Sequence, residues 1–234
     1  MTEQQLRENV AQVRRRMEDA AARAGRDPKE ILLCAASKTQ DADTVRLAAE
    51  MDIDLFGENR VQELTEKHAA NAYGSKPLHF IGHLQTNKVR QVVGVASLIQ
   101  SVDSEHLLNA VNRQAEKKEL CQEILLEINI GAEASKSGVS PAQLDALAQA
   151  AGQLEHVRVR GLMAIPPATA TPDETRAFFA RMRELLTQAR SRFGSELDVL
   201  SMGMSGDYPL AIREGATIVR IGTAIYGARD YSKK

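Results

Sequence analysis

The chain has 234 residues, of which 43% carry apolar side chains and 26% are charged. This composition is typical of a soluble globular protein that buries a substantial core. The 30 basic residues nearly balance the 31 acidic ones, which argues against a general attraction to nucleic acid or to an anionic membrane. An anionic ligand would therefore need a local binding site.

The N-terminal segment, residues 1–25, is too highly charged for a secretory signal, and no apolar stretch reaches the length of a membrane span. Two cysteines, Cys34 and Cys121, lie far apart in apolar runs, which predicts reduced, buried thiols rather than a disulfide. The five histidines lack the spacing typical of metal ligands, so no metal site is expected. These features favour a cytoplasmic protein.

Eight apolar runs of strand length follow one another along the chain. Segments with helical spacing and good helix formers separate most of them. The expected strands are 31–37, 54–59, 78–82, 97–103, 123–130, 157–165, 197–205 and 217–227. The clearest expected helices are 43–51, 60–70, 104–118, 140–152 and 174–193.

This alternation predicts parallel strands joined by right-handed helical crossovers, and eight repeats are enough to close a barrel. The sequence therefore predicts an α/β fold in which residues 1–234 form a single domain, a (β/α)8 TIM barrel with an extra N-terminal helix. A doubly wound open sheet is the competing architecture. It is disfavoured because the first strand runs into SKTQD at 37–41 and not into a glycine-rich fingerprint.

In such a barrel the working site lies at the carboxyl ends of the strands. Lys38 directly follows the first strand, where desolvation and nearby cations lower the pKa of an ammonium and make the amine a nucleophile for carbonyl groups. A lysine that forms a Schiff base is one interpretation. A lysine that reaches from the strand end to solvent is the other, and position alone favours the second.

Two glycine-containing segments follow the last two strands. Gly203, Ser205 and Gly206 lead into a helical stretch, where free backbone N–H groups could face a phosphate. Gly222 and Thr223 offer a second set of donors. Phosphate sites in these barrels are often built after strands seven and eight, where both segments fall. A purely structural turn explains each glycine alone about as well.

Other residues near the expected site have two interpretations. Glu58 and Asn59 either contact a ligand or cap the following helix. His83 is the one histidine placed to reach the site, and Lys136 either contacts an anion or points to solvent from its loop. The segment 203–207 is not a serine nucleophile elbow, because its last glycine comes one residue early.

Seven motifs span these positions: SKTQ at 37–40, FGENRVQE at 56–63, HFIGHLQTNK at 79–88, INI followed by SKSG at 128–138, GLMAIPP at 161–167, LSMGMSGD at 200–207 and RIGTAIYGARDYSKK at 220–234. In combination they closely resemble the pyridoxal phosphate homeostasis protein family. The resemblance runs from about residue 8 to the last residue. Two departures are visible: His83 stands where proline is more usual, and Gly206 replaces a common aspartate.

The resemblance implies one barrel like the N-terminal domain of alanine racemase, holding pyridoxal 5′-phosphate (PLP). It implies that Lys38 forms the Schiff base, that Asn59 lies beside the ring and that Arg220 faces the pyridine nitrogen. A guanidinium there disfavours protonation of the ring nitrogen and weakens the ring as an electron sink. Around the phosphate it places Ser201, Gly203, Met204, Ser205, Gly222 and Thr223.

The resemblance also implies a role in vitamin B6 homeostasis, in which the protein buffers or delivers PLP to dependent apoenzymes without dedicated catalysis. The alternative is a PLP-dependent amino-acid racemase, whose second base would have to be Tyr208, Tyr226, Lys136 or His83. In racemases one base comes from a further C-terminal domain, and this chain ends at Lys234 before any such domain.

Two more distant alternatives are a phosphosugar aldolase or isomerase that uses the same lysine, and an interaction module that senses the vitamin. No apolar stripe remains outside the barrel pattern, which favours a monomer.

Overall fold

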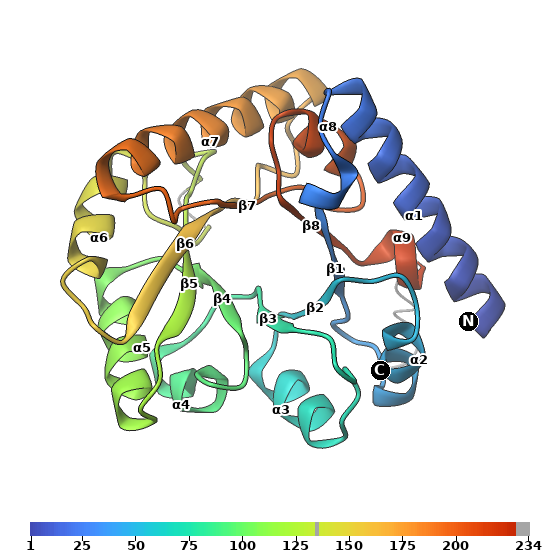
Figure 1. Ribbon diagram of the computed structural model, residues 1–234, viewed down its shortest axis with the longest axis horizontal. Coiled ribbons are helices and arrows are strands. Elements are labelled where there is room, and N and C mark those ends of the chain that lie inside the picture. The colour runs from blue at the N-terminus through green and yellow to red at the C-terminus, as the bar shows by residue number, and fades with distance from the viewer. Residues whose placement is uncertain (134–135, 228–234) are drawn as a thin grey trace.

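The computed structural model describes residues 1–133 and 136–227. Its strands are all parallel and form one closed barrel in chain order, with the last strand hydrogen-bonded to the first. Helices surround the strands on the outside (Figure 1). The predicted (β/α)8 barrel is therefore confirmed. The strands are β1 (Leu32–Ala36), β2 (Leu55–Glu58), β3 (Leu78–Phe80), β4 (Leu98–Val102), β5 (Gln122–Glu127), β6 (Val157–Met163), β7 (Val199–Ser201) and β8 (Ile218–Ile221).

The three longest helices, α1, α5 and α7, begin at a residue whose side chain caps the helix. Thr171 and Glu174 form a capping box at the start of the longest helix, α7, and the Thr2 hydroxyl accepts a hydrogen bond from Gln5 N at the start of α1. The α-helices are α1 (Glu3–Arg23), α2 (Ala42–Ala49), α3 (Val61–Ala69), α4 (Val89–Val92), α5 (Glu105–Lys117), α6 (Leu144–Ala151), α7 (Pro172–Phe193), α8 (Tyr208–Arg213) and α9 (Thr223–Tyr226). The 3-10 helices within the described residues are η1 (Pro28–Glu30), η2 (Thr86–Lys88) and η3 (Pro141–Gln143).

The predicted N-terminal helix is α1, which packs along α8 and α9 on the outside of the barrel (Figure 1). The expected last strand, 217–227, is shorter than predicted. It ends at Ile221, and Thr223–Tyr226 forms α9 instead. The apolar side chains of Ile225 and Tyr226 continue the sequence pattern of a strand, but they are buried where α9 meets α1 and not in the sheet.

The core has two layers because successive residues of a strand point to opposite faces. A large cluster fills the space between strands and helices. A second cluster contains only strand residues and fills the inside of the barrel; its members are Cys34, Leu55, Leu98, Leu125, Met163 and Ile218. Positions two residues further along each strand must face the same interior, closer to the carboxyl end.

Gly161 allows β6 and β7 to pair closely. Its φ is 153°, and a Cβ there would lie 1.8 Å from the carbonyl oxygen of Val199. The register between β5 and β6 also shifts just before this glycine pairs with Leu125. Any side chain at this position would force β6 away from β7, so the barrel depends on a glycine here. Within the described residues, no helix is both long and apolar enough to cross a bilayer.

Candidate functional site

The upper interior of the barrel is polar. Gln100, Glu127, Ser201 and Arg220 each lie two residues beyond an inward-facing apolar residue of the same strand, and all four are at most 8% exposed. Alternation along the strands therefore brings side chains from β4, β5, β7 and β8 together inside the carboxyl end of the barrel. Arg220 also lies next to β1, where it pairs in register with Cys34.

A chain of hydrogen bonds crosses this interior and fixes Arg220. The guanidinium donates to Ser201 Oγ at 2.5 Å and to the Ala164 carbonyl oxygen at 3.0 Å. Ser201 Oγ donates to Gln100 Oε1 at 2.6 Å, and Gln100 Nε2 lies 2.9 Å from His79 Nδ1. Because the amide nitrogen can only donate, His79 Nδ1 accepts and the imidazole is neutral. Burial lowers the pKa of His79 to about 4, in agreement with a neutral ring.

These hydrogen bonds make Ser201 a direct partner of Arg220, a contact that the sequence did not predict. Its single hydroxyl hydrogen is directed to Gln100, and its oxygen accepts from Arg220. In this arrangement the hydroxyl holds the guanidinium. Gln100 and His79 were not singled out from the sequence, although their inward positions on β4 and β3 could have been found from strand alternation alone.

Glu127 is a buried carboxyl group that interacts electrostatically with the Arg220 guanidinium. Burial, with a further contribution from Asp103, raises the pKa of Glu127 to about 7, while Arg220 opposes the increase. Burial also raises the pKa of the Cys34 thiol to about 12, so the thiol is neutral at physiological pH. Burial lowers the pKa of Arg220 below its usual value, although a guanidinium remains charged.

The raised pKa of Glu127 predicts a pH-dependent stability. A carboxyl that binds its proton more tightly in the folded state than in the unfolded state favours folding at low pH, and this contribution is lost as pH rises from about 4.5 to about 7. Replacing Glu127 with glutamine should therefore stabilise the protein at pH 8, by on the order of 3 kcal/mol, and have little effect near pH 4.5.

Urea titrations of both proteins without added ligand, at pH 4.5 and pH 8, would measure the difference. Comparing the variant with the parent cancels the opposite contribution of His79, which is common to both. An equal effect at the two pH values would contradict a titrating Glu127.

Lys38 lies where the sequence predicted, just beyond the end of β1, and is half-buried. It occupies a turn closed by a hydrogen bond from Gln40 N to the Ser37 carbonyl oxygen at 3.1 Å. β1 is hydrogen-bonded to both β2 and β8. The turn that carries Lys38 therefore stands between the strand ends that carry Asn59 and Arg220.

Asn59 and Gly82 meet at the ends of β2 and β3. A Cβ at Gly82 would lie 2.2 Å from the Asn59 carbonyl oxygen, so only glycine allows this close approach. Asn59 Oδ1 is buried and has no hydrogen-bond partner in the structure. Such an acceptor is unfavourable unless a ligand donor or water reaches it. Asn59, Gly82 and Glu127 line a pocket of about 290 Å³ beside the polar interior.

Glu58 fits neither interpretation that the sequence offered. Its side chain is fully buried, and it accepts hydrogen bonds from Ser37, Lys67 and Tyr73. The residue that caps α3 is Arg60, without a side-chain hydrogen bond. Glu58 therefore lies behind the site, where it belongs to a buried cluster next to the Lys38 turn.

The two glycine-containing segments come together, as expected from their positions after β7 and β8. Ser205 Oγ accepts hydrogen bonds from Gly222 N at 3.3 Å and Ala224 N at 3.2 Å. A Cβ at Gly222 would lie 3.4 Å from the Ala36 carbonyl oxygen, which places this segment beside the end of β1. Gly203 has a φ of 91°, and a Cβ there would meet Ala211 of α8 at 2.6 Å.

The remaining predicted residues of these segments are more exposed. Met204 is 38% exposed, and its N–H is already bonded to Asp207 Oδ1 at 2.6 Å. Thr223 is also exposed. Nothing lies within 4 Å of a Cβ at Gly206, so this departure from the family pattern leaves open space.

His83 and Lys136 lie at the rim of the barrel. The His83 side chain is 60% exposed, with Nδ1 3.2 Å from Ser137 Oγ and 3.5 Å from Asp103 Oδ2. Lys136 Nζ contacts Glu133 Oε2 at 2.6 Å and the Pro166 carbonyl oxygen at 3.0 Å. Lys136 is therefore held by neighbouring loops and does not point freely to solvent.

Tyr208 and Tyr226 are both buried, and neither hydroxyl has a hydrogen-bond partner in the structure. Burial is the main cause that raises the pKa of each phenol. Neither tyrosine resembles a base that exchanges protons with solvent. The part of the last sequence motif at 228–234 lies outside the described residues.

The expected burial of Cys121 was wrong. Cys34 is buried as predicted, but Cys121 is exposed. Cys121 directly precedes β5, at the amino end of the barrel, where the chain has not yet entered the sheet. The strand begins one residue later with Gln122, and its apolar residues begin only at Ile124, so they do not extend burial to the thiol.

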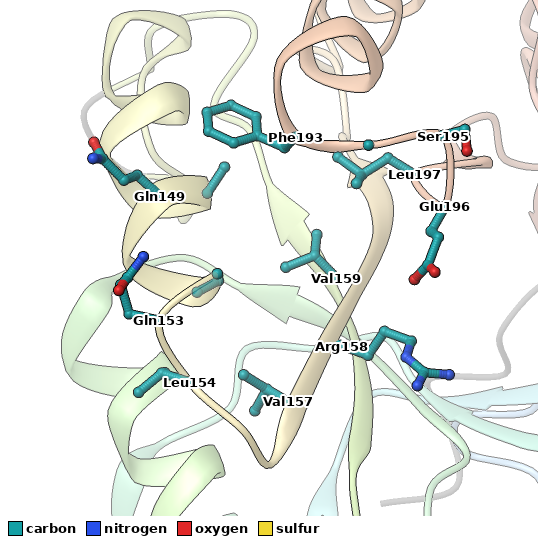
Figure 2. Close-up of a pocket in the computed structure, with 14 residues that line it drawn as sticks. Gln149, Gln153, Leu154, Val157, Arg158, Val159, Phe193, Ser195, Glu196 and Leu197 are labelled. Atoms are coloured by element: carbon teal, nitrogen blue, oxygen red, sulfur yellow. The ribbon is translucent and has the colours of Figure 1, made fainter.

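A groove of about 580 Å³ lies at the opposite end of the barrel, between the C-terminal ends of α6 and α7 and the start of β6. Figure 2 shows apolar side chains such as Leu154 and Val159 around it, with the Phe193 ring at one side. None of the predicted site residues lines this groove. The candidate site is instead the polar carboxyl end of the barrel.

Comparisons with known proteins show the family to which the chain belongs. The family model described as the alanine racemase N-terminal domain matches residues 2–230. A pyridoxal phosphate homeostasis protein of Pseudomonas aeruginosa is 45% identical over 226 residues, which cover 97% of this chain and 96% of that protein. One of Aquifex aeolicus is 41% identical over 224 residues, covering 96% and 98% of the two chains.

Solved structures agree with this fold. PipY of Synechococcus elongatus, solved with PLP bound, superposes with a TM-score of 0.82 at 34% identity, covering 95% of this chain and all (100%) of that one. An unknown protein from Bifidobacterium adolescentis has a TM-score of 0.91 at 34% identity, covering 96% of this chain and 95% of that one. A diaminopimelate decarboxylase at 16% identity shares the fold only.

Proposed function

Because the chain belongs to the alanine racemase N-terminal domain family, together with relatives named pyridoxal phosphate homeostasis proteins, we propose that it binds PLP and serves PLP homeostasis. The PLP-bound structure of its relative PipY supports the choice of cofactor. In this chain the proposal is supported most directly by Arg220, a buried guanidinium fixed inside the barrel on the strand next to the Lys38 turn.

The residues present fit this cofactor. Among the described residues, Asn59 Oδ1 is a buried acceptor with no partner, and Gly222 lies close to the end of β1 beside the Ser205 segment. We propose that Lys38 binds the cofactor covalently as a Schiff base, that Asn59 lies beside the ring and that Arg220 faces the ring nitrogen. The proposed phosphate contacts are Ser201, Gly203, Met204, Ser205, Gly222 and Thr223, and Ser201 also holds Arg220.

When bound, PLP supplies an aldehyde that reacts with amines and a ring that withdraws electrons. Arg220 limits the second property, because a fixed cation beside the ring nitrogen opposes its protonation. The carbonyl oxygen of Ala164 and the hydroxyl of Ser201 occupy donors of the guanidinium and keep it in the interior. The chain therefore retains the cofactor while making it a poor electron sink.

We further propose that the protein buffers or delivers PLP without dedicated turnover. Two of the four candidates for a second racemase base, Tyr208 and Tyr226, are buried, and Lys136 is held by Glu133 and Pro166. Stereospecific exchange of an amino-acid α-proton, at a rate well above that of free PLP, would favour the racemase alternative instead.

The proposed setting is a monomer in the cytoplasm that passes PLP to apoenzymes that need it. Size-exclusion chromatography with light scattering tests the monomer. Mixing the loaded protein with an apoenzyme, and following recovery of the apoenzyme's activity, tests delivery.

The first experiment is to load the protein with PLP, record its visible absorbance and reduce it with borohydride before peptide mass mapping. We expect a yellow protein whose visible band disappears as a pyridoxyl group becomes fixed on Lys38. A colourless protein that cannot be loaded would overturn the proposal and favour a phosphosugar enzyme.

A further inference from the structure

A buried ion cluster lies directly behind the turn that carries Lys38. Lys67 Nζ, on α3, donates to Glu58 Oε1 at 2.8 Å and to the Ser37 carbonyl oxygen at 2.7 Å. Ser37 Oγ and Tyr73 OH also donate to Glu58 Oε1, at 2.6 Å and 3.2 Å. Glu63 lies 3.4 Å from Lys67 Nζ and provides a second carboxylate.

The cluster holds both sides of the Lys38 turn. Before Lys38, the Ser37 carbonyl and hydroxyl groups are bonded to Lys67 and Glu58. After Lys38, the backbone N–H of Thr39 donates to Glu63 Oε2 at 2.6 Å. The backbone on each side of Lys38 is therefore attached to an acidic or basic side chain from α3.

The turn itself needs such support. Thr39 has a φ of 68°, in the left-handed region that a β-branched residue rarely adopts. The turn is closed by Gln40 N and the Ser37 carbonyl oxygen, so Lys38 and Thr39 are its two central residues. A type II turn of this kind normally has glycine at the position of Thr39. Strained backbone persists only where surrounding contacts determine it, and such positions are common at functional sites.

The charges are too deeply buried to be explained by stability alone. The side chains of Lys67 and Glu58 are only 6% and 0% exposed. Desolvation of a buried ion pair offsets much of its attraction, so apolar residues of similar size often give a fold at least as stable. A buried ion pair can instead serve to specify one local conformation. Here the pair is bonded to Ser37, so the conformation that it specifies is that of the Lys38 turn.

We propose that Lys67, Glu58 and Glu63 are positioning residues that hold the Lys38 turn in the geometry needed to bind PLP covalently. This inference rests on the proposed function and extends it to residues that do not touch the ligand. Lys67 anchors the turn on one side, Glu63 anchors it on the other, and Glu58 supplies the countercharge that keeps Lys67 buried.

The test uses the full chain loaded with PLP. Glu63→Ala removes the acceptor of Thr39 N while leaving the Lys67–Glu58 pair intact, and Lys67→Met removes the anchor of Ser37. Lys117→Met, which changes an exposed lysine on α5, is the matched control. For each protein we would measure the dissociation constant of PLP, the pH midpoint of the visible band and the melting temperature.

We expect both cluster variants to bind PLP about tenfold more weakly or worse, because small displacements of a reacting group are costly. The pH midpoint of the visible band should also shift, since the environment of the Lys38 nitrogen changes. Glu63→Ala remains informative if Lys67→Met fails to fold, because Lys67 and Glu58 still pair in the Glu63→Ala variant. The double variant Lys67→Met with Glu58→Gln removes both buried charges and gives a second folded comparison.

A folded variant that loses melting temperature but keeps both the dissociation constant and the pH midpoint would overturn the inference, because a purely structural cluster predicts that result. Failure of the proposed function looks different. In that case the unaltered protein and Lys117→Met would also fail to load PLP.

Discussion

Replacing Lys38 with alanine should abolish the covalent attachment of PLP. No other described lysine follows a strand of the barrel at the position next to both Asn59 and Arg220, so no substitute amine is expected to take its place. Borohydride treatment of the loaded variant should fix no pyridoxyl group, and the visible band of the bound cofactor should be absent. The free energy of unfolding should change by about 1 kcal/mol or less, because trimming a half-buried side chain in a turn removes little packing.

Lys38→Arg is the matched variant, since it keeps the positive charge but replaces a nucleophilic amine with a guanidinium that does not form a Schiff base at neutral pH. It should resemble Lys38→Ala in the reduction experiment and the parent protein in net charge. A visible band that persists in both variants, with the pyridoxyl group mapped to another lysine such as Lys136, would show that the attachment site is elsewhere.

The barrel could be predicted from the sequence because its signals are local. Each strand is a short apolar run, each long helix has its own period and cap, and the alternation of the two predicts the topology. The predicted elements are wrong where the local sequence pattern favours one structure and the tertiary packing favours another. Ile225 and Tyr226 extend an apolar run that looks like β8, yet they are buried against α1 because the chain turns at Gly222.

The positions of the candidate site residues in the fold could be predicted in part. Lys38 and the two glycine-containing segments follow strand ends, so their convergence follows from the topology alone. The partners of these residues could not be predicted in the same way. Lys67 reaches the Ser37 carbonyl across 30 residues, and Ser201 bonds to Gln100 across 101 residues. Such contacts depend on how α3 packs against the barrel and on which side chains face its interior. The hydrophobic pattern of a single segment shows neither.

Replacing Arg220 with methionine should change the cofactor more than the fold. The substitution leaves Ser201 Oγ and the Ala164 carbonyl oxygen without their donor inside the barrel, which should destabilise the protein by about 1–3 kcal/mol. Methionine still fills most of the volume. Glu127 loses the cation that lowers its pKa, so this carboxyl should remain protonated to a higher pH than in the parent protein.

For PLP the expected result is weaker retention, by about tenfold or more, together with a displaced visible band, because a charged group no longer faces the ring nitrogen. The ring nitrogen then gains protons more easily, so exchange of an amino-acid α-proton into deuterated water should be faster per bound cofactor than in the parent protein. Absorbance spectra, the PLP dissociation constant and proton exchange followed by NMR would measure the three effects.

Two control variants separate the effect of the Arg220 charge from the effect of its hydrogen bonds and from any general effect of removing an arginine. Arg220→Lys keeps the charge but loses the planar fork that bonds to Ser201 and Ala164 together, so it should retain the slow proton exchange while binding PLP less tightly. Arg213→Met removes an exposed arginine from α8 and should leave all three measurements unchanged. If Arg220→Met keeps both the visible band and the affinity of the parent protein, Arg220 does not face the cofactor, and its buried charge serves the barrel interior alone.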